Sequence, residues 1–242
     1  MKIHGRNSLR EAIKAGREIQ KVYVAKGSKL PNDLMRMLRA VGVPIVRVPS
    51  NKLDILVGNK EHQGVVAIVS PIEFADPYAI IKNAVRNKGI VLIADHIEDP
   101  HNLGAMIRSA EVFGVSGVVV PKARSAPISD TVIKSSAGAV FHIPIARVPN
   151  IRNFMRDFKK AGGWIAAVEV GGEDISKFKF PFPIALVLGA EGRGVSKAVI
   201  KDSDFVISIP MVGKVGSLNV SNACAIALYC AFVARRELKT LA

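Results

Sequence analysis

Three segments of the sequence combine polar side chains with glycine, and each follows a short apolar run. In the first, after residues 91–94, Asn102 and Arg108 stand six positions apart within a helical pattern. An amide and a guanidinium can position a hydroxyl or phosphate group and stabilise negative charge that develops on it. In the alternative, structural interpretation, Asn102 caps the helix and Arg108 lies on a solvated helix face.

The second segment follows the run 184–188 and places Gly189, Gly192 and Gly194 within six residues. Such glycines allow a backbone to approach a ligand closely or to adopt a positive φ, although an ordinary glycine-rich turn has the same composition. A dinucleotide site is excluded, because the G-x-G-x-x-G spacing lacks its third glycine. Glu191 would repel a phosphate group but can accept hydrogen bonds or orient a neighbouring side chain.

The third segment, residues 210–230, leads through two glycines into the polar start of an apolar helix, at Ser217, Asn219 and Ser221. Its spacing does not match the phosphate-binding G-x-x-x-x-G-K-[ST] loop, which excludes ATP hydrolysis of that type. Capping of the helix is the structural alternative.

Other catalytic patterns are weak. The five histidines lack metal-ligand spacing and the chain has two cysteines, so we expect no metal site. A G-x-S-x-G nucleophile elbow does not occur. His62, Gln63 and Gly64 precede the apolar run 65–69 and either contact RNA or form a turn before a strand.

The elements that must position these segments alternate between strands and helices. Beyond residue 90, short runs rich in β-branched residues predict buried parallel strands at 91–94, 118–120, 143–148, 165–170, 184–188 and 206–209. Helical spacing occurs between and after them, at 103–113, 151–160, 196–201 and 218–236. This order predicts an α/β fold with an open parallel sheet and helices on both faces. Ligands of such folds bind beyond the carboxyl ends of the strands.

The N-terminal third predicts a separate small α/β domain, with helices at 7–15 and 33–39 and strands at 22–25, 45–48 and 65–69. Pro71 and Pro77 interrupt the pattern. We therefore place a first domain at 1–72, a linker with a first helix at 73–89 and the second domain at 90–242. Residues 1–75 hold 13 Lys+Arg and 6 Asp+Glu, a net charge of +7 that equals the net charge of all the remaining residues.

The composition limits the partners and the location of the protein. A net charge of +14, from 34 Lys+Arg and 20 Asp+Glu, favours a polyanion such as nucleic acid. The longest apolar runs have strand length, so we expect no membrane span. No apolar stretch follows the basic N-terminus, and we expect a cytoplasmic protein. Cys224 and Cys230 are expected to be reduced thiols.

Taken in order, the three segments resemble the three motifs of the SPOUT methyltransferases, in the SpoU (TrmH) branch that methylates ribose 2′-hydroxyls of RNA. Asn102 with Arg108 matches the first motif, residues 189–192 the second, and residues 209–211 with 217–221 the third. The match covers residues 90–237. The N-terminal segment resembles the small ribosomal-protein-like substrate-binding domain of the subgroup that acts on a guanosine of 23S ribosomal RNA.

This resemblance implies a deep trefoil knot in the C-terminal α/β domain, although unknotted connections are the general rule. It also implies a homodimer and S-adenosylmethionine as the cofactor. The residues that match the cofactor-binding loops are Leu188, Gly189, Glu191, Gly192, Ile209, Met211 and Leu218.

The resemblance further suggests catalytic roles. A guanidinium is a poor base, so we assign Arg108 to binding the target phosphate and stabilising alkoxide charge. Asn102 would orient the ribose, Glu191 would hold Arg108 or Asn219, and Ser217 and Asn219 would line the substrate side. We expect methylation of 23S ribosomal RNA and no binding of DNA. The alternatives are a transfer RNA substrate, methylation that confers antibiotic resistance, and a non-catalytic RNA-binding assembly factor.

Overall fold

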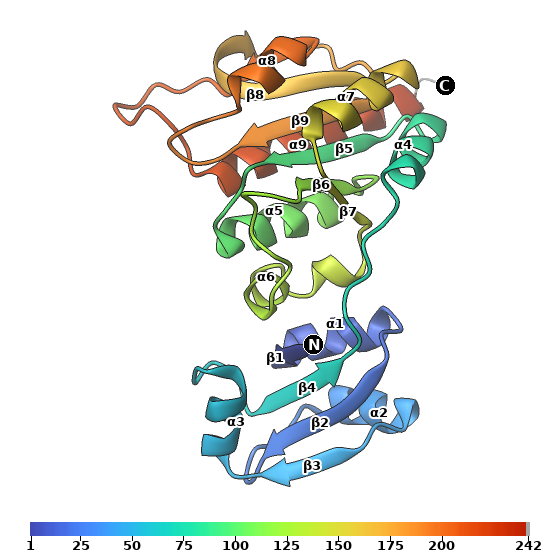
Figure 1. The fold of residues 1–242 in the computed structure, drawn as a ribbon, viewed down its shortest axis with the longest axis vertical. Helices are drawn as coiled ribbons and strands as arrows, with labels where there is room; N and C mark the ends of the chain where they lie inside the picture. The colour runs from blue at the N-terminus through green and yellow to red at the C-terminus, as the bar shows by residue number, and fades with distance from the viewer. Residues whose placement is uncertain (241–242) are drawn as a thin grey trace.

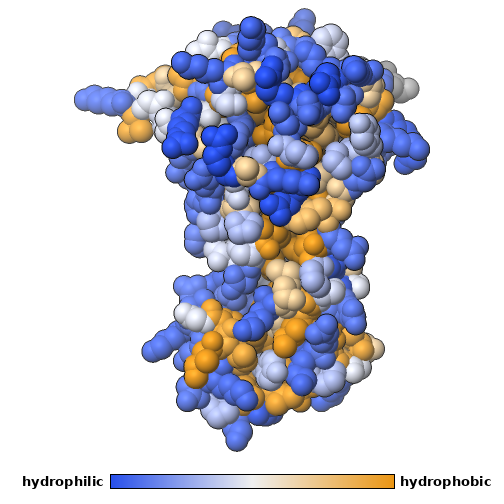
Figure 2. Space-filling model, viewed as in Figure 1, coloured by the Kyte–Doolittle hydropathy of each residue, from blue (hydrophilic) through white to orange (hydrophobic). Residues whose placement is uncertain are grey.

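Apolar runs of strand length build two separate sheets, one in each lobe of an elongated molecule (Figure 1). The computed structural model describes residues 1–240. Residues 1–69 form the N-terminal lobe, residues 77–240 form the C-terminal lobe, and residues 70–76 connect them. Figure 2, in the same view, shows a narrow waist between the two lobes.

The N-terminal lobe is a four-stranded mixed sheet in the order β1-β4-β2-β3, in which only β2 and β3 run parallel. Its elements are β1 (Lys2–His4), α1 (Arg6–Lys14), β2 (Ile19–Ala25), α2 (Asn32–Val41), β3 (Ile45–Val48), α3 (Ser50–Val57) and β4 (Val65–Val69). The sequence did not predict β1 and α3, which are short. α3 ends at Gly58, whose φ of 74° is the left-handed conformation that favours glycine.

His62 has a structural role in this lobe, as the interpretation of residues 62–64 as a turn before a strand requires. The side chain is buried, and its Nε2 lies 2.8 Å from Oδ1 of Asp54 in α3. The backbone N–H of Gly64 donates to its Nδ1 at 2.9 Å. The imidazole therefore fixes the turn before β4 and is not available to contact RNA.

The C-terminal lobe contains six parallel strands in the order β10-β8-β9-β5-β6-β7. The strands are β5 (Ile90–Asp95), β6 (Val118–Pro121), β7 (Ile145–Val148), β8 (Trp164–Asp174), β9 (Ile184–Gly189) and β10 (Phe205–Ser208). The helices are α4 (Pro77–Arg86), α5 (Pro100–Val112), α6 (Asp130–Ser135), α7 (Ile151–Lys160), α8 (Lys197–Asp202) and α9 (Val220–Thr240), with a 3-10 turn η1 at Ala139–Phe141. None of the helices described is long and apolar enough to cross a bilayer.

Alternating side chains of the strands fill two apolar layers, which confirms the predicted parallel sheet with helices on both faces. Val91 and Ile93 of β5 pack in one layer with residues of α4, α7 and α8. Leu92 and Ala94 face the other layer, which includes residues of α5 and α9. Cys224 is buried in this second layer, and both cysteines are free thiols.

Two parts of this lobe differ from the prediction. β8 continues to Asp174, four residues past the predicted end, because its second half pairs with β10 across a register shift between Val206 and Ile207. The sequence did not predict α6 and η1, which lie between β6 and β7 and face the N-terminal lobe. No observation tests the trefoil threading, which stays a prediction.

The lobes meet where α1 and β1 pack against α6 and η1 (Figure 1). Gly138 has a φ of 88°, and a Cβ at this position would lie 2.5 Å from Cβ of Glu11 in α1. Oε2 of the Glu11 carboxylate is 2.9 Å from Nε2 of His142, and Lys134 pairs with Glu61. The contact between the lobes is therefore close, and it combines these ion pairs with apolar packing, because Leu9 and Ala12 of α1 belong to the same hydrophobic cluster as Ala139 and Val140 of η1.

Candidate active site

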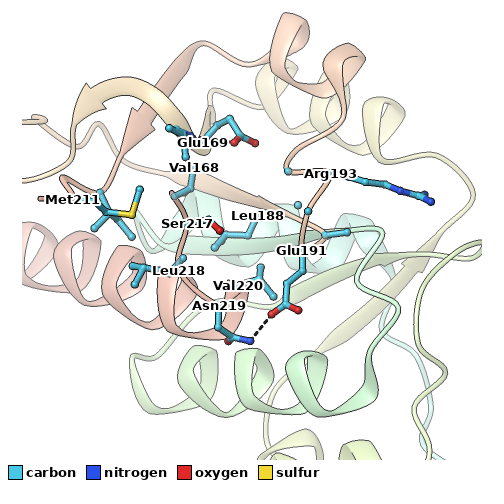
Figure 3. Close-up of a pocket in the computed structure, with 17 residues that line it drawn as sticks. Val168, Glu169, Leu188, Glu191, Arg193, Met211, Ser217, Leu218, Asn219 and Val220 are labelled. Atoms are coloured by element: carbon cyan, nitrogen blue, oxygen red, sulfur yellow. Dashed lines mark hydrogen bonds between the residues drawn. The ribbon is translucent and has the colours of Figure 1, made fainter. Parts of the chain in front are cut away.

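Residues 168–170 of β8, the loops that follow β9 and β10, and the start of α9 surround a cavity of about 530 Å³ at the carboxyl edge of the sheet (Figure 3). All seven residues predicted for cofactor contact line it, and so do Ser217 and Asn219. The complete lining is Val168, Glu169, Val170, Leu188, Gly189, Ala190, Glu191, Gly192, Arg193, Gly194, Ile209, Met211, Ser217, Leu218, Asn219, Val220 and Ala223. We call this space the first cavity.

Gly189 is required for the shape of this cavity. A Cβ at this position would lie 2.0 Å from the backbone carbonyl carbon and oxygen of Gly194, a distance that no side chain can occupy. The loop folds back at this point, because the backbone N–H of Gly194 donates to the carbonyl of Ala190 at 2.8 Å. The glycine spacing noted in the sequence thus allows a close approach of two backbone segments.

Glu169 in β8 is a cavity residue that the sequence analysis missed. Its Oε2 accepts a hydrogen bond from the backbone N–H of Val195 at 2.7 Å, which ties the loop after β9 to β8. β8 and β9 are adjacent parallel strands, so the rule that ligands bind at carboxyl edges points to the end of either strand. The sequence could have indicated Glu169, because the predicted strand 165–170 ends one residue after it.

Asn219 connects the three sequence motifs. Its Nδ2 donates to Oδ1 of Asn102 at 3.0 Å and to Oε1 of Glu191. Figure 3 shows the Asn219 and Glu191 side chains pointing toward each other. Oδ1 of Asn219 accepts from the backbone N–H of Ser221 at 2.9 Å and so caps α9. Of the two predicted partners of Glu191, the structure therefore places Asn219 in contact with it.

The prediction that Asn102 caps its helix is wrong. Asp99 is the N-cap of α5, and its carboxylate accepts hydrogen bonds from the backbone N–H groups of His101 and Asn102 at 3.1 and 3.2 Å. An aspartate before a proline at the first helical position is a strong start signal, which the sequence analysis overlooked. Because Asp99 does the capping, the Asn102 side chain is free to bond to Asn219.

Arg108 does not join this group within one chain. Six residues turn an α-helix by about 600°, which directs Arg108 about 120° away from Asn102 around α5. Its side chain is exposed and lines neither of the cavities described here. Within the single chain, Arg108 therefore does not lie in either cavity with Asn102 and Glu191.

A second cavity of about 450 Å³ lies on the other side of the loop after β9. Ala190, Glu191, Arg193, Gly194 and Val220 line both cavities. The remaining residues of the second cavity are Asp95, His96, Ile97, Glu98, Asp99, Asn102, Arg124 and Ser196. In Figure 3 the Arg193 side chain points away from the apolar side chains of the first cavity. The wall between the cavities therefore carries both the glycine-rich loop and polar groups.

The residues of the first cavity fit S-adenosylmethionine. Leu188, Ile209 and Leu218 offer apolar surface for a purine ring, and backbone groups around Gly189 offer hydrogen bonds. The carboxylates of Glu169 and Glu191 would repel a phosphate-bearing nucleotide but suit a sulfonium cation. When bound, this cofactor supplies an electrophilic methyl group. Among the described residues, no cluster of His, Cys, Asp and Glu could hold a metal ion.

The fold and the site define a class of protein: a two-lobed α/β chain with a cofactor cavity at the carboxyl edge of a parallel sheet. Residues 89–229 match the SpoU rRNA Methylase family, and residues 2–75 match the RNA 2′-O ribose methyltransferase substrate-binding family. The chain therefore belongs to the SpoU methylase family.

Individual relatives align with most of the length of this chain. The chain is 39% identical over 240 residues to a TrmH family tRNA/rRNA methyltransferase of Staphylococcus aureus, covering 97% of this chain and 96% of the relative. The SpoU methyltransferase AviRb of Streptomyces viridochromogenes, solved with S-adenosylmethionine, superposes with a TM-score of 0.83 at 27% identity, covering 98% and 90% of the two chains. The TrmH/SpoU tRNA-modifying enzyme of A. aeolicus aligns over 67% of this chain and 86% of its own, with a TM-score of 0.56 and 27% identity.

These observations establish the activity at the level of the family. The chain is an S-adenosylmethionine-dependent RNA 2′-O-methyltransferase of the SpoU/TrmH family, with a substrate-binding lobe before its methylase lobe.

Proposed function

We propose that the protein methylates the 2′-hydroxyl of a guanosine in 23S ribosomal RNA. The observation that carries this proposal is the N-terminal lobe, which belongs to a substrate-binding family and concentrates a net charge of +7 in 75 residues. Phosphate contacts from such a lobe supply affinity without reading sequence, which suits a large folded RNA. We place the reaction in the cytoplasm, where both free cysteines stay reduced.

We further propose that the two cavities bind different reactants. S-adenosylmethionine occupies the first cavity, and the acceptor ribose enters the second, so that methyl transfer takes place at their shared wall. Asn102, held by Asn219, orients the ribose. Ser217 and Asn219, which the sequence analysis assigns to the substrate side, line the first cavity and so lie on the cofactor side in this arrangement. Glu191 keeps the Asn219 amide in place. Positioning of this kind can lower a barrier by about 7 to 11 kcal/mol.

A direct comparison of RNA substrates tests the choice of 23S ribosomal RNA. Purified protein is supplied with methyl-labelled S-adenosylmethionine and either deproteinised ribosomal RNA or bulk transfer RNA from cells that lack the protein. We expect label in one guanosine of the large ribosomal RNA. Label confined to transfer RNA, which is the alternative substrate, would overturn the ribosomal assignment and leave the family activity intact.

We also propose a homodimer that covers an apolar face formed by α5 and α9. These helices pack together, yet Val112, Ile226 and Tyr229 are 64%, 38% and 55% exposed. The Tyr229 ring lies beside Phe113, with ring centroids 5.9 Å apart, so the exposed side chains of both helices are neighbours. Arg108 is one helical turn before Val112 and lies on this same face. In the dimer, Arg108 would therefore act on RNA bound to the partner subunit.

Mixed dimers test this arrangement. Arg108→Ala and Asn219→Ala should each inactivate the protein, and differently tagged copies of the two variants can be expressed together and purified as mixed dimers. If Arg108 serves the partner's site, one site of each mixed dimer has both wild-type residues, and activity returns to part of the wild-type level. A mixed dimer as inactive as its parents would exclude action across the interface, and a monomer in solution would exclude the dimer itself.

A further inference from the structure

His96 and Asp95 form a side-chain pair in the second cavity that the roles assigned above do not use. Asp95 is the last residue of β5, His96 follows it directly, and both line that cavity. Nδ1 of His96 lies 2.5 Å from Oδ1 of Asp95. The Asp95 side chain is 1% exposed, whereas the His96 side chain is 30% exposed. One end of the imidazole is therefore held by a buried carboxylate while the ring remains open to the cavity.

The buried carboxylate is itself held in place. Oδ2 of Asp95 accepts a hydrogen bond from the backbone N–H of Ser196 at 2.8 Å, which joins β5 to the loop after β9. Since a carboxylate accepts hydrogen bonds, Nδ1 of His96 is the donor, and Nε2 of the neutral ring is left as an acceptor. No described residue gives Nε2 a hydrogen-bond partner. Its basic nitrogen is consequently available to a ligand in the second cavity.

His96 has a left-handed backbone conformation, as do four other non-glycine residues among those described, Gln63, Lys88, Arg124 and Ala137. Its φ is 58°, in the left-handed region that only a few per cent of non-glycine residues adopt. With this backbone conformation, the imidazole contacts the carboxylate of Asp95, the residue before it.

We propose that His96 accepts the proton of the ribose 2′-hydroxyl during methyl transfer, with Asp95 as a positioning residue. This step rests on the proposed entry of the ribose into the second cavity. The O2′ oxygen forms a bond to the methyl carbon as the bond between sulfur and that carbon breaks, with the electron pair of the broken bond left on sulfur. The hydroxyl proton passes to Nε2 of His96 and from there to solvent. A guanidinium such as that of Arg108 is then free to stabilise charge without acting as a base.

Other charged groups also line the second cavity. They are the carboxylates Asp95, Glu98, Asp99 and Glu191 and the guanidinium groups Arg124 and Arg193. Carboxylates and guanidinium groups ordinarily titrate far below and far above neutrality, whereas imidazole is the side chain that changes charge between about pH 5 and pH 8. A neutral-range change in the rate of methyl transfer would thus report on His96.

Single-turnover methyl transfer measured against pH tests the proposal. For the wild type, we expect a rate that rises with pH and then levels off once the imidazole is neutral. His96→Asn tolerates the left-handed backbone but lacks the base, so the rate should fall by about 10²- to 10⁴-fold and lose this pH dependence. Cofactor and RNA affinities should be unchanged. The matched control is His101→Asn, an exposed histidine outside both cavities, which should keep the wild-type rate and profile.

Chemical rescue separates a proton acceptor from a structural side chain. His96→Gly suits the backbone and leaves space for a small base, so added imidazole should restore part of the rate in a saturable way. Asp95→Asn should slow transfer while the conformation, followed by circular dichroism, stays intact. A wild-type rate and profile in His96→Asn, or no rescue of His96→Gly, would overturn the proposal. Absence of transfer by the wild type to any RNA would instead overturn the proposed function.

Discussion

At the scale of single residues, the side-chain amide of Asn219 makes two kinds of contact, one through its oxygen and one through its nitrogen. Its oxygen caps α9 through Ser221, and its nitrogen connects Asn102 with Glu191. Loss of an N-cap costs about 0.5 to 2 kcal/mol of stability. The position is therefore important for both folding and the site, and the two contributions can be separated by choosing the substitution.

Asn219→Ala should lose both functions, and Asn219→Asp only one. The aspartate keeps an oxygen for the cap but places a second carboxylate opposite Glu191, which opens the contact between the motifs. We expect Asn219→Ala to lower the free energy of unfolding by about 1 kcal/mol and Asn219→Asp to lower it less. Methyl transfer should fall strongly in both. Urea unfolding and a transfer assay check this, and an active Asn219→Asp would show that the amide nitrogen is dispensable.

The residues of the first cavity were more predictable than those of the second. The first cavity is lined by glycine-rich and polar segments that can be recognised in the sequence, at Gly189, Gly192, Ser217 and Asn219. His96 and Asp95 are ordinary residue types, and their pairing can be seen only in the folded chain. Arg108 also belongs to a recognisable motif, but its direction around α5 depends on the helix phase relative to Asn102.

At the scale of elements, the loop after β9 shapes the site, because its residues line both cavities. Strands and helices of the C-terminal lobe were predictable because buried parallel strands form continuous apolar runs. β1, α3 and α6 were not, because they have three, eight and six residues and are stabilised mainly by packing against other elements. The far half of β8 depends on pairing with β10, which local sequence does not encode.

Gly189→Ala tests the close approach within this loop. The added methyl group would overlap the backbone of Gly194, so the loop must move and the first cavity must change shape. We expect loss of S-adenosylmethionine binding in a calorimetric titration, together with a lower melting temperature. Gly213→Ala is the matched control, since a Cβ there meets nothing within 4 Å, and it should bind the cofactor normally. Normal binding by Gly189→Ala would refute the role given to this glycine.

At the scale of the whole molecule, ion pairs and apolar packing together join the substrate-binding lobe to the methylase lobe. Burial opposes ionisation of Glu11, but hydrogen bonds from Lys14 and His142 outweigh it and hold the pKa of the Glu11 carboxyl below its ordinary value of 4.5. A lowered folded-state pKa means that the ionised group stabilises the fold above its unfolded-state pKa. That stabilisation is lost as the pH falls through the folded-state pKa.

Glu11→Gln should therefore weaken the contact between the lobes near neutral pH, by at most about 1 kcal/mol because the pair is partly exposed. The stability difference between wild type and variant should shrink as the pH is lowered below 4.5, when the wild-type carboxyl is protonated as well. Urea unfolding between neutral and acidic pH measures this difference. Asp33→Asn, which loses a pair with Arg10 inside the N-terminal lobe, is the control for effects unrelated to the lobe contact. A difference that stays constant into acid would contradict the assignment.

Methyl transfer to ribose at the shared wall of the two cavities is the central claim, and analysis of the reaction product tests it most directly. RNA is incubated with the protein and methyl-labelled S-adenosylmethionine, digested to nucleosides and separated by chromatography with mass detection. We predict that all label elutes with a 2′-O-methylated nucleoside and that the Asn219→Ala protein incorporates none. Label on a base, or equal labelling by this variant, would contradict the account.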